Sequence, residues 1–229
     1  MRRPSLCASR RPTLNRRGNF GGSKSKIVSR ACESLLVETK PAGFVSTRSD
    51  PHARDTIFDL LPSKFRRLFS IGRLDAQSEG LLILTNDGEL AQRLMHPRYK
   101  IEKEYELLLD RPWDPTLAPR LLRGVFLDSQ RAKIVRLHSV TPTRLRVVLR
   151  QGINRQIRRM FHEIGYEVKR LVRVRIGNLH LGDLPTGHWR ALTKREIKSV
   201  DAAVSAANRE PLRAARPPLQ RQRNEIRRV

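Results

Sequence analysis

Hydrophobic and polar residues alternate over several short stretches with the period of two that is typical of β-strands. In Ile101–Leu109 the odd positions, which include Lys103 and Tyr105, share one face, and three glutamates share the other. The same alternation marks Leu145–Leu149, and the unbroken apolar run Leu81–Leu84 predicts a fully buried strand. These stretches indicate an antiparallel sheet with one face packed on a core.

The stretch Val172–Ile176 also alternates, but its polar positions are Arg173 and Arg175. Side chains two residues apart on a strand point to the same face. We therefore expect this strand to present one basic face to an anionic ligand.

The most regular helical pattern lies in Gly152–Gly165, where five apolar residues recur at helical spacing. At about 100° per residue, Asn154 and Arg158 lie together at the border of the apolar stripe, and Arg155 and Arg159 face outward. Arg158 is thus placed to reach a partly buried carboxylate.

Capping residues mark two further helices. Asp87 is a candidate N-cap for a helix that Pro97 ends, and Thr193 with Glu196 forms the capping box of a last short helix. Many strands, short turns and few helices predict an α+β fold, with a mixed, mostly antiparallel sheet and flanking helices.

The chain has 229 residues and a formal net charge of +25 at pH 7. Residues 1–32 contribute +9 and residues 201–229 contribute +4, so residues 33–200 retain +12. The patterned part is therefore basic as well, which indicates a polyanionic partner such as nucleic acid. We divide the chain into a disordered basic arm, 1–33, a folded domain, 34–200, and a disordered basic tail, 201–229.

Other features narrow the class by exclusion. The two cysteines form no CxxC motif, the six histidines show no metal-ligand spacing, and no apolar run approaches the length of a membrane span. We expect no metal, no membrane contact, a cytoplasmic location and a monomer. The Arg-rich, acid-free start of the chain also leaves open an organellar targeting peptide.

The candidate chemistry lies in the stretch Ser70–Leu90. If residues 73–75 are extended, Arg73 and Asp75 point to one side and Leu74 points toward apolar packing. A cation and a carboxylate would then be displayed together beside a buried strand, which is how a fold holds a reactive carboxylate still.

The motifs around Asp75 resemble those of ribosomal pseudouridine synthases, in the branch that contains the small-subunit enzyme and its large-subunit relatives. The resemblance covers about residues 35–198, with the motifs in order. It is carried by Lys40–Gly43, Gly72–Asp75, Ser78–Leu82, Thr85–Gly88, His96–Arg98, Glu102–Tyr105, Gly152–Met160, Gly165–Tyr166, Gly187, Trp189, Leu192 and Thr193.

The resemblance implies a pseudouridine synthase fold with a catalytic cleft, and an isomerase that converts uridine in RNA to pseudouridine without a cofactor. It implies that Asp75 attacks the target nucleotide, that Tyr105 packs on the target base, and that Arg158 pairs with Asp75. Arg73 is similar to the side chain that fills the space left by the flipped base.

These implied roles agree with elementary chemistry. A nucleophilic carboxylate must be ionised, and a neighbouring arginine favours that form. Flipping a base out of folded RNA costs about a few kcal/mol, and stacking on an aromatic ring contributes roughly 1–3 kcal/mol per base. The candidate RNA-binding residues are Arg73, Lys103, Asn154, Arg155, Arg159, Arg173 and Arg175.

One departure from close relatives concerns the choice of target. Those relatives usually carry a small S4-type RNA-binding domain before the catalytic domain, although some members of the branch lack it. The roughly 34 residues before the match are too few and too polar to form one. The Gly152–Met160 motif is most similar to large-subunit enzymes, so we favour 23S-type ribosomal RNA. A tRNA or small-subunit rRNA target, or a non-catalytic RNA-binding or ribosome-assembly protein on the same fold, are the alternatives.

Overall fold

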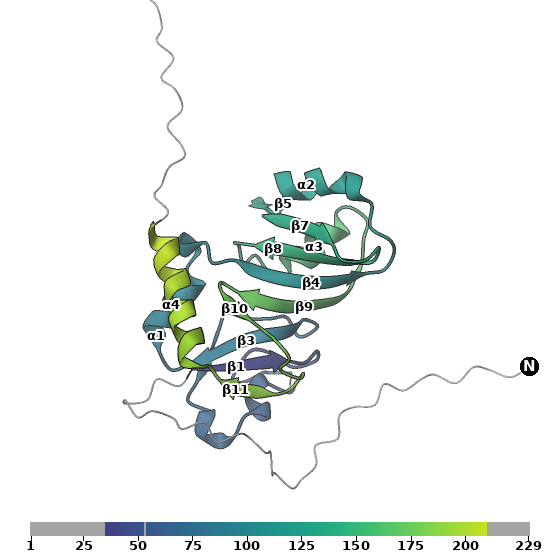
Figure 1. Cartoon of the computed structure of the whole chain (residues 1–229). Coiled ribbons are helices and arrows are strands. Elements are labelled where there is room, and N and C mark those ends of the chain that lie inside the picture. The colour runs from purple at the N-terminus through teal and green to yellow at the C-terminus, as the bar shows by residue number, and fades with distance from the viewer. Residues whose placement is uncertain (1–34, 53, 210–229) are drawn as a thin grey trace, which may run out of the picture. The chain divides into compact units, whose positions relative to one another are not determined.

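A computed structural model describes residues 35–52 and 54–209 of the chain (Figure 1). All of them belong to one unit, Cys32–Val229. The expected basic arm, 1–33, and the part of the expected tail from residue 210 onward lie outside the described residues.

Eleven strands and four α-helices make up the described part of the chain. The strands are β1 (Leu35–Lys40), β2 (Phe69–Ile71), β3 (Glu79–Thr85), β4 (Lys103–Leu109), β5 (Val125–Leu127), β6 (Gln130–Ala132), β7 (Arg136–Ser139), β8 (Arg144–Leu149), β9 (Val168–Ile176), β10 (Leu179–His180) and β11 (Trp189–Ala191). The helices are α1 (Gly88–Met95), α2 (Ala118–Arg123), α3 (Gln156–His162) and α4 (Lys194–Arg209), and short 3-10 turns lie at Ile57–Leu60, Ser63–Phe65, Pro97–Tyr99 and Pro115–Leu117.

Nine of the strands form one sheet, with the order β11-β1-β3-β9-β4-β8-β7 and with β2 and β10 added to β3 and β9. The only parallel pair in this sheet is β3 with β9, so two antiparallel halves meet at that pair. β5 and β6 form a separate hairpin. The expected α+β class with a mixed, mostly antiparallel sheet is confirmed.

The two strands of the parallel pair meet at a glycine. Gly80 has a φ of +100°, and a Cβ added there would come within 2.4 Å of the carbonyl oxygen of Arg173. Any larger residue would push β3 away from β9, because backbone atoms cannot yield as a flexible side chain can. Gly80 is therefore the residue that lets the two halves of the sheet join.

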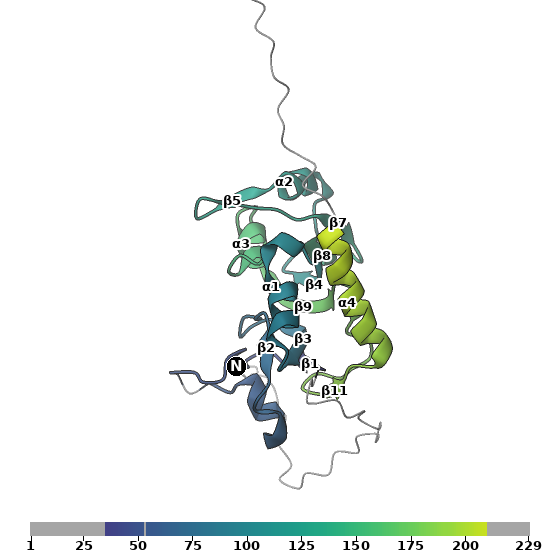
Figure 2. The ribbon, with the colours of Figure 1, turned by 90° about the vertical axis from the view of Figure 1, so that its left-hand side faces the viewer.

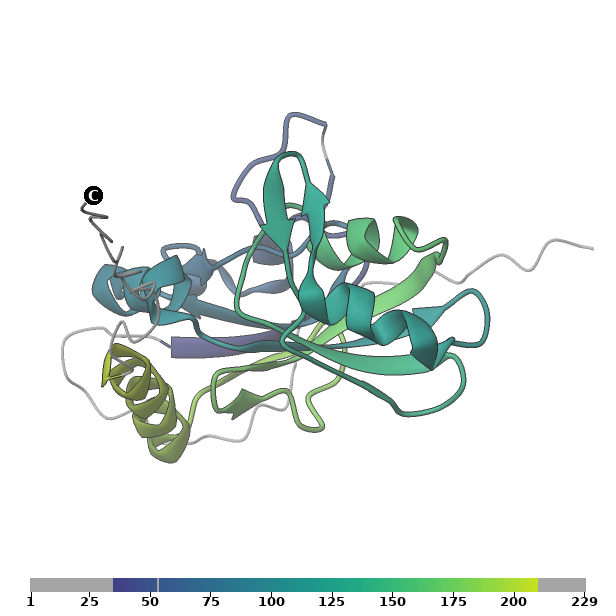
Figure 3. The same ribbon diagram turned by 90° about the horizontal axis from the view of Figure 1, so that it is seen from above.

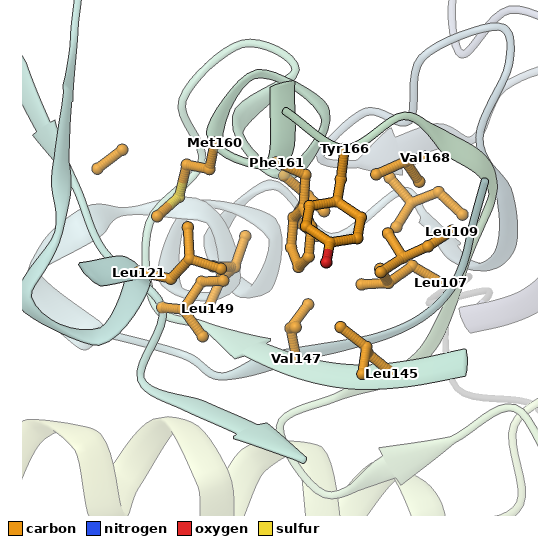
Figure 4. Packing of buried hydrophobic residues seen from close by; sticks show 14 of the residues in the cluster. Leu107, Leu109, Leu121, Leu145, Val147, Leu149, Met160, Phe161, Tyr166 and Val168 are labelled. Carbon is orange, nitrogen blue, oxygen red and sulfur yellow. The ribbon is translucent and has the colours of Figure 1, made fainter. Parts of the chain in front are cut away.

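The largest core cluster lies between α3 and the strands β4 and β8. Phe161 and Met160 of α3 are fully buried there, as the apolar stripe of this helix predicts (Figure 4). The apolar positions of the alternating strands, including Leu107 and Val147, complete the cluster from the sheet side.

Two helices pack on the half of the sheet that contains β1 and β3. α1 and α4 lie together there (Figure 2), and α4 is on the side of the sheet opposite to α3 (Figure 3). Both predicted caps are confirmed. The Asp87 carboxylate accepts from the Leu90 amide at 2.9 Å, and Thr193 and Glu196 bond reciprocally as a capping box.

The expected end of the folded domain at residue 200 is wrong. α4 continues to Arg209, and Val200 and Val204 are both buried, in the core cluster that α1 also contributes to. The composition after residue 200 suggested an unfolded tail because the apolar residues are sparse. Two valines at i and i+4 are nevertheless enough to dock one face of a helix.

Candidate active site

Asp75 lies in the loop that joins β2 to β3, and not on a strand. Gly72 takes a φ of +74°, and residues 73–75 have no regular secondary structure. That Arg73 and Asp75 point to one side therefore stays a prediction. Leu74 is buried as expected, Arg73 is exposed, and the Asp75 side chain is 27% exposed.

Backbone contacts hold the first part of this loop. The Ser46 hydroxyl lies 3.2 Å from both the amide nitrogen and the carbonyl oxygen of Leu74. The carbonyl of Asp75 accepts from the Ser78 amide at 3.0 Å, which closes a turn, and the carbonyl of Ala76 accepts from the Gly43 amide at 2.7 Å.

Two cations hold the rest of the loop. Lys40 Nζ donates to the carbonyls of Ala76 and Ser78 at 3.2 and 2.7 Å. Arg158 Nη2 donates to the carbonyl of Gln77 at 3.1 Å. All five carbonyls from residue 74 to residue 78 thus have a partner, so the backbone that carries the Asp75 carboxylate is anchored on every peptide unit.

Lys40 is the site residue that sequence reasoning missed. The stretch Lys40–Gly43 reads as a turn, and nothing local shows that the lysine reaches a loop 36 residues further along the chain. The residue is fully buried, and burial lowers the pKa of Lys40 to about 8 against the opposing pull of Glu38 and Asp75. The motif match itself was the available signal.

The anchored loop lies over one row of paired residues that crosses the sheet. Lys40 pairs with Gly80, Gly80 with Arg173, and Arg173 with Tyr105, on β1, β3, β9 and β4. Directly paired residues project to the same face, so we call the face that carries Lys40, Arg173 and Tyr105 the active-site face. Tyr105 is half-buried and packs against the large core cluster.

The expected ion pair between Arg158 and Asp75 is not among the contacts of the described residues. Arg155 makes it instead, with Nη1 3.8 Å from Asp75 Oδ2, and also donates to the Gln77 side chain. Arg158 acts on Asp75 through the field of its charge while its guanidinium holds the carbonyls of Gln77 and Val168. Burial and the neighbouring Arg155 lower the pKa of Arg158.

The position at which α3 starts explains why Arg155, and not Arg158, pairs with Asp75. The helix was expected from residue 152, but it begins at Gln156, and Arg155 has a left-handed φ of +48°. Asn154 and Arg155 therefore lie in the turn before the helix, and both are exposed. Helical geometry, which placed Asn154 beside Arg158, does not apply to them.

Arg173 was expected to contact RNA, and the structure contradicts this. It is 2% exposed, and its Nε donates to the Leu81 carbonyl at 2.8 Å. The burial of Lys103 lowers the pKa of that lysine to about 8, and the positive charge of Arg173 lowers it as a smaller, second cause. Arg173 therefore lies within the sheet, where it raises the local positive potential, and not on the rim of the site. An RNA contact by Lys103 stays a prediction.

Arg175 was expected to share a basic face with Arg173, and this is also wrong. The pairing register shifts between Glu104 and Tyr105, so Arg173 pairs with Tyr105 and Arg175 pairs with Glu104. Adjacent residues of a strand face opposite ways, so the bulge separates the two arginines. Alternation in β9 alone cannot show a shift that depends on β4.

Arg175 belongs instead to a cluster of ion pairs, which we call the outer charge cluster. Its Nε lies 2.7 Å from Glu104, and Glu102 is within 3.4 Å of three arginines. Burial alone would raise the pKa of Glu102, but these arginines lower it. The members of the cluster are Glu102, Glu104, Glu106, Arg136, Arg146, Arg150 and Arg175.

Arg159 also has a protein partner. Its Nη2 lies 2.8 Å from Asp128, in the turn of the β5–β6 hairpin. The Asp128 side chain is 81% exposed, so this pair is open to solvent and weak. Arg159 therefore remains available to a phosphate.

The described residues contain no group of three or more His, Cys, Asp or Glu side chains arranged to hold a metal ion. None of the helices within 35–52 and 54–209 is long and apolar enough to cross a membrane.

An anchored, partly exposed carboxylate thus lies beside Arg155, in the field of Arg158 and of the buried cation Lys40. The family described as RNA pseudouridylate synthase matches residues 34–163, more than half of the chain. The chain therefore belongs to the RNA pseudouridylate synthase family. The resemblance of its motifs and the expected enzyme class are confirmed at this level.

Curated relatives agree with this assignment. The dual-specificity RNA pseudouridine synthase RluF of Escherichia coli is 38% identical over 80% of this chain and 63% of its own length. The ribosomal large subunit pseudouridine synthase B of Pseudomonas aeruginosa is 38% identical over 74% of this chain and 46% of its own length. The chain thus spans less than two thirds of the length of these two relatives.

A crystal structure of a pseudouridylate synthase has a similar fold. It superposes with a TM-score of 0.70 at 28% identity, over 73% of this chain and 74% of that one. The expected fold family is therefore confirmed.

Proposed function

We propose that this protein isomerises a uridine of large-subunit ribosomal RNA to pseudouridine, with Asp75 as the attacking carboxylate and without a cofactor. The observation that carries the proposal is the anchoring of all five carbonyls from residue 74 to residue 78. A loop held at each peptide unit presents its carboxylate in one direction, and displacement by about 1 Å can cost roughly 100-fold in rate.

The neighbours of Asp75 fit the charge of the reaction. Arg155 lies 3.8 Å from the carboxylate, and Arg158 and Lys40 add positive charge from their places in the protein. This positive field draws a phosphate backbone toward the loop. The partly exposed Asp75 side chain leaves room for a nucleotide to approach.

The target base must leave the RNA stack before Asp75 can reach it. Tyr105 is half-buried at the end of the row that begins beneath the Asp75 loop, where its ring would pack on the flipped base. Arg73 is exposed two residues before Asp75, and would fill the space that the base leaves. Exposed Arg155 and half-buried Arg159 would hold phosphates of the same strand.

Ribosomal RNA of the large subunit is favoured because a relative that is 38% identical is named for that subunit. A relative of equal identity is named dual-specificity, so a second RNA target is the alternative within the same chemistry. A non-catalytic RNA-binding role would need the arginines but would give no reason to anchor a carboxylate on five peptide units.

The direct test is to map pseudouridines in ribosomal RNA and tRNA from cells with and without this protein. Loss of one pseudouridine in large-subunit RNA, restored by the wild-type gene, is the expected result. Loss of a pseudouridine only in tRNA or small-subunit RNA would show that the substrate is that RNA instead. An unchanged map would refute the proposed pseudouridine synthase activity.

A further inference from the structure

The β5–β6 hairpin displays an aromatic ring to solvent. Phe126 is 72% exposed, more than any other large apolar side chain in the described part of the chain. Its cross-strand partner is Arg131, which is also exposed. Val125, Leu127 and Ala132, which alternate with these two, are buried in the large core cluster. Phe126 therefore belongs to the face of the hairpin that points away from the core.

The packing of the hairpin and its tight turn keep Phe126 on the outward face. Asp128 and Ser129 both have positive φ, 45° and 65°, which is the tight two-residue turn that matches the twist of paired strands. Asp128 is tied to Arg159 of α3 at 2.8 Å. The underside of the hairpin packs on the core, so exposure of Phe126 is a property of the folded hairpin.

The hairpin is close to the candidate active site. The amide of Arg159, its partner on α3, donates to the carbonyl of Arg155 at 3.0 Å, and Arg155 is the ion-pair partner of Asp75. Phe126 is two strand residues, about 7 Å, from Asp128. The hairpin and α3 lie on the same side of the sheet (Figure 3). The hairpin that carries Phe126 is thus linked to Asp75 through Arg159 and Arg155, on one side of the sheet.

The surroundings of Phe126 identify the kind of ligand. Arg123, Arg131 and Lys133 are exposed near it along the hairpin, and the Arg131 guanidinium is steadied by the Arg123 carbonyl at 2.6 Å. A surface for a protein partner would surround the ring with further apolar side chains. An isolated aromatic ring among cations fits single-stranded RNA, in which bases stack on the ring and phosphates meet the cations.

We propose that the outward face of the β5–β6 hairpin is a second RNA-contact surface, on which Phe126 stacks with an unpaired base beside the target uridine while Arg131 and Lys133 hold adjacent phosphates. This inference rests on the proposed function. It adds a contact outside the catalytic loop that contributes affinity and a preference for unpaired flanking nucleotides, and no chemistry.

The test compares Phe126→Ser with Phe126→Tyr and with Val140→Ser. Val140 is 47% exposed in the turn between β7 and β8, so Val140→Ser also removes an exposed apolar side chain. The probes are a fluorescein-labelled large-subunit rRNA fragment that contains the mapped uridine, and a fully paired RNA duplex of the same length. Dissociation constants are measured first, and single-turnover rates at saturating fragment are measured second.

Phe126→Ser should weaken binding of the fragment about 10-fold or more, as expected for one lost stack, and should leave binding of the duplex within about twofold. Phe126→Tyr should restore the affinity, Val140→Ser should change neither probe, and rates at saturation should stay within about twofold. Equal affinities of Phe126→Ser and Val140→Ser for the fragment would overturn the proposal, as would an equal loss on the duplex. If wild-type protein binds the fragment without forming pseudouridine, the proposed function fails while the affinities still decide the role of Phe126.

Discussion

The active-site face and the outer charge cluster are both rich in cations, but the cations have different partners. In the outer charge cluster the arginines form ion pairs with carboxylates. Arg175, for example, pairs with Glu104 at 2.7 Å. On the active-site face the cations donate hydrogen bonds to backbone carbonyls. Lys40, for example, donates to the carbonyls of Ala76 and Ser78. A carboxylate cancels the charge of its partner, whereas a carbonyl orients the cation and leaves its net charge.

The same residue types therefore do different things in the two regions. The outer charge cluster ties β4, β7, β8 and β9 together. Its pairs with Arg136, Arg146 and Arg150 are partly exposed, so each of these contributes little to stability. The cations of the active-site face keep a positive potential under Asp75 and fix the loop that carries it. The difference explains why a net charge of +25 does not by itself show which arginines bind RNA.

The largest effect that separates the two regions is expected at Lys40. Lys40→Met should lower the single-turnover rate about 100-fold, because the carbonyls of Ala76 and Ser78 lose their common donor and the Asp75 loop shifts. The fold should survive, because methionine is apolar and of similar length, and a thermal unfolding curve would check this.

The matched control for Lys40→Met is Arg146→Met. Arg146 pairs with Glu106 at 3.3 Å in the outer charge cluster, and its side chain is 43% exposed. This variant should keep the rate within about twofold and the unfolding free energy within about 1 kcal/mol. Equal rate losses in Lys40→Met and Arg146→Met would contradict the claim that only the cations of the active-site face support catalysis.

A smaller effect is expected from two arginines of α3. Arg158→Ala should lower the single-turnover rate at saturating RNA about 10-fold, because the Gln77 carbonyl loses its donor. Arg159→Ala breaks only the pair with Asp128 and should weaken RNA binding with little change in rate. Both variants remove one positive charge from the same helical turn. If both lose only affinity, and by similar amounts, Arg158 is a phosphate contact and not a support of the loop.

The smallest effect is one of stability and involves no chemistry. Burial raises the pKa of Glu38 to about 8, with Lys40 opposing the shift. The folded state then keeps a proton that the unfolded state releases near pH 4.5, so stability is lost as pH rises from about 4.5 to 8. Glu38→Gln cannot release a proton and should be more stable than wild type at pH 8 by about 2–4 kcal/mol, with the two nearly equal at pH 5.

Denaturant unfolding of both proteins at pH 5 and pH 8 measures this difference. The window stops at pH 8 because Lys40, whose pKa is lowered to about 8, changes the balance above it. A constant offset between the two proteins at both pH values would show that Glu38 is not a buried, protonated acid.

Local pattern was enough to predict much of the fold. The apolar stripe of Ile157, Met160 and Phe161 and the caps at Asp87 and Thr193 depend on neighbours within one or two turns, and the structure has them as predicted. The motif at Asp75 likewise pointed to the loop that the structure anchors.

What sequence reasoning missed depends on contacts between distant segments. The bulge that turns Arg175 away from Arg173 exists only in the pairing of β9 with β4. The reach of Lys40 to the Asp75 loop and the left-handed Arg155 before α3 are set by packing and not by propensity. The partner of Asp75 was therefore wrong by three residues, although the helix was correctly identified.

The central claim is that Asp75, and no other carboxylate near the arginines, performs the attack. The measurement is single-turnover pseudouridine formation at saturating RNA by Asp75→Asn, with Glu106→Gln of the outer charge cluster as the control and RNA affinity recorded on the same samples. The account predicts no product from Asp75→Asn, with affinity equal to or tighter than wild type because a repelling charge is gone, and a near-normal rate from Glu106→Gln. A near-normal rate from Asp75→Asn would contradict it.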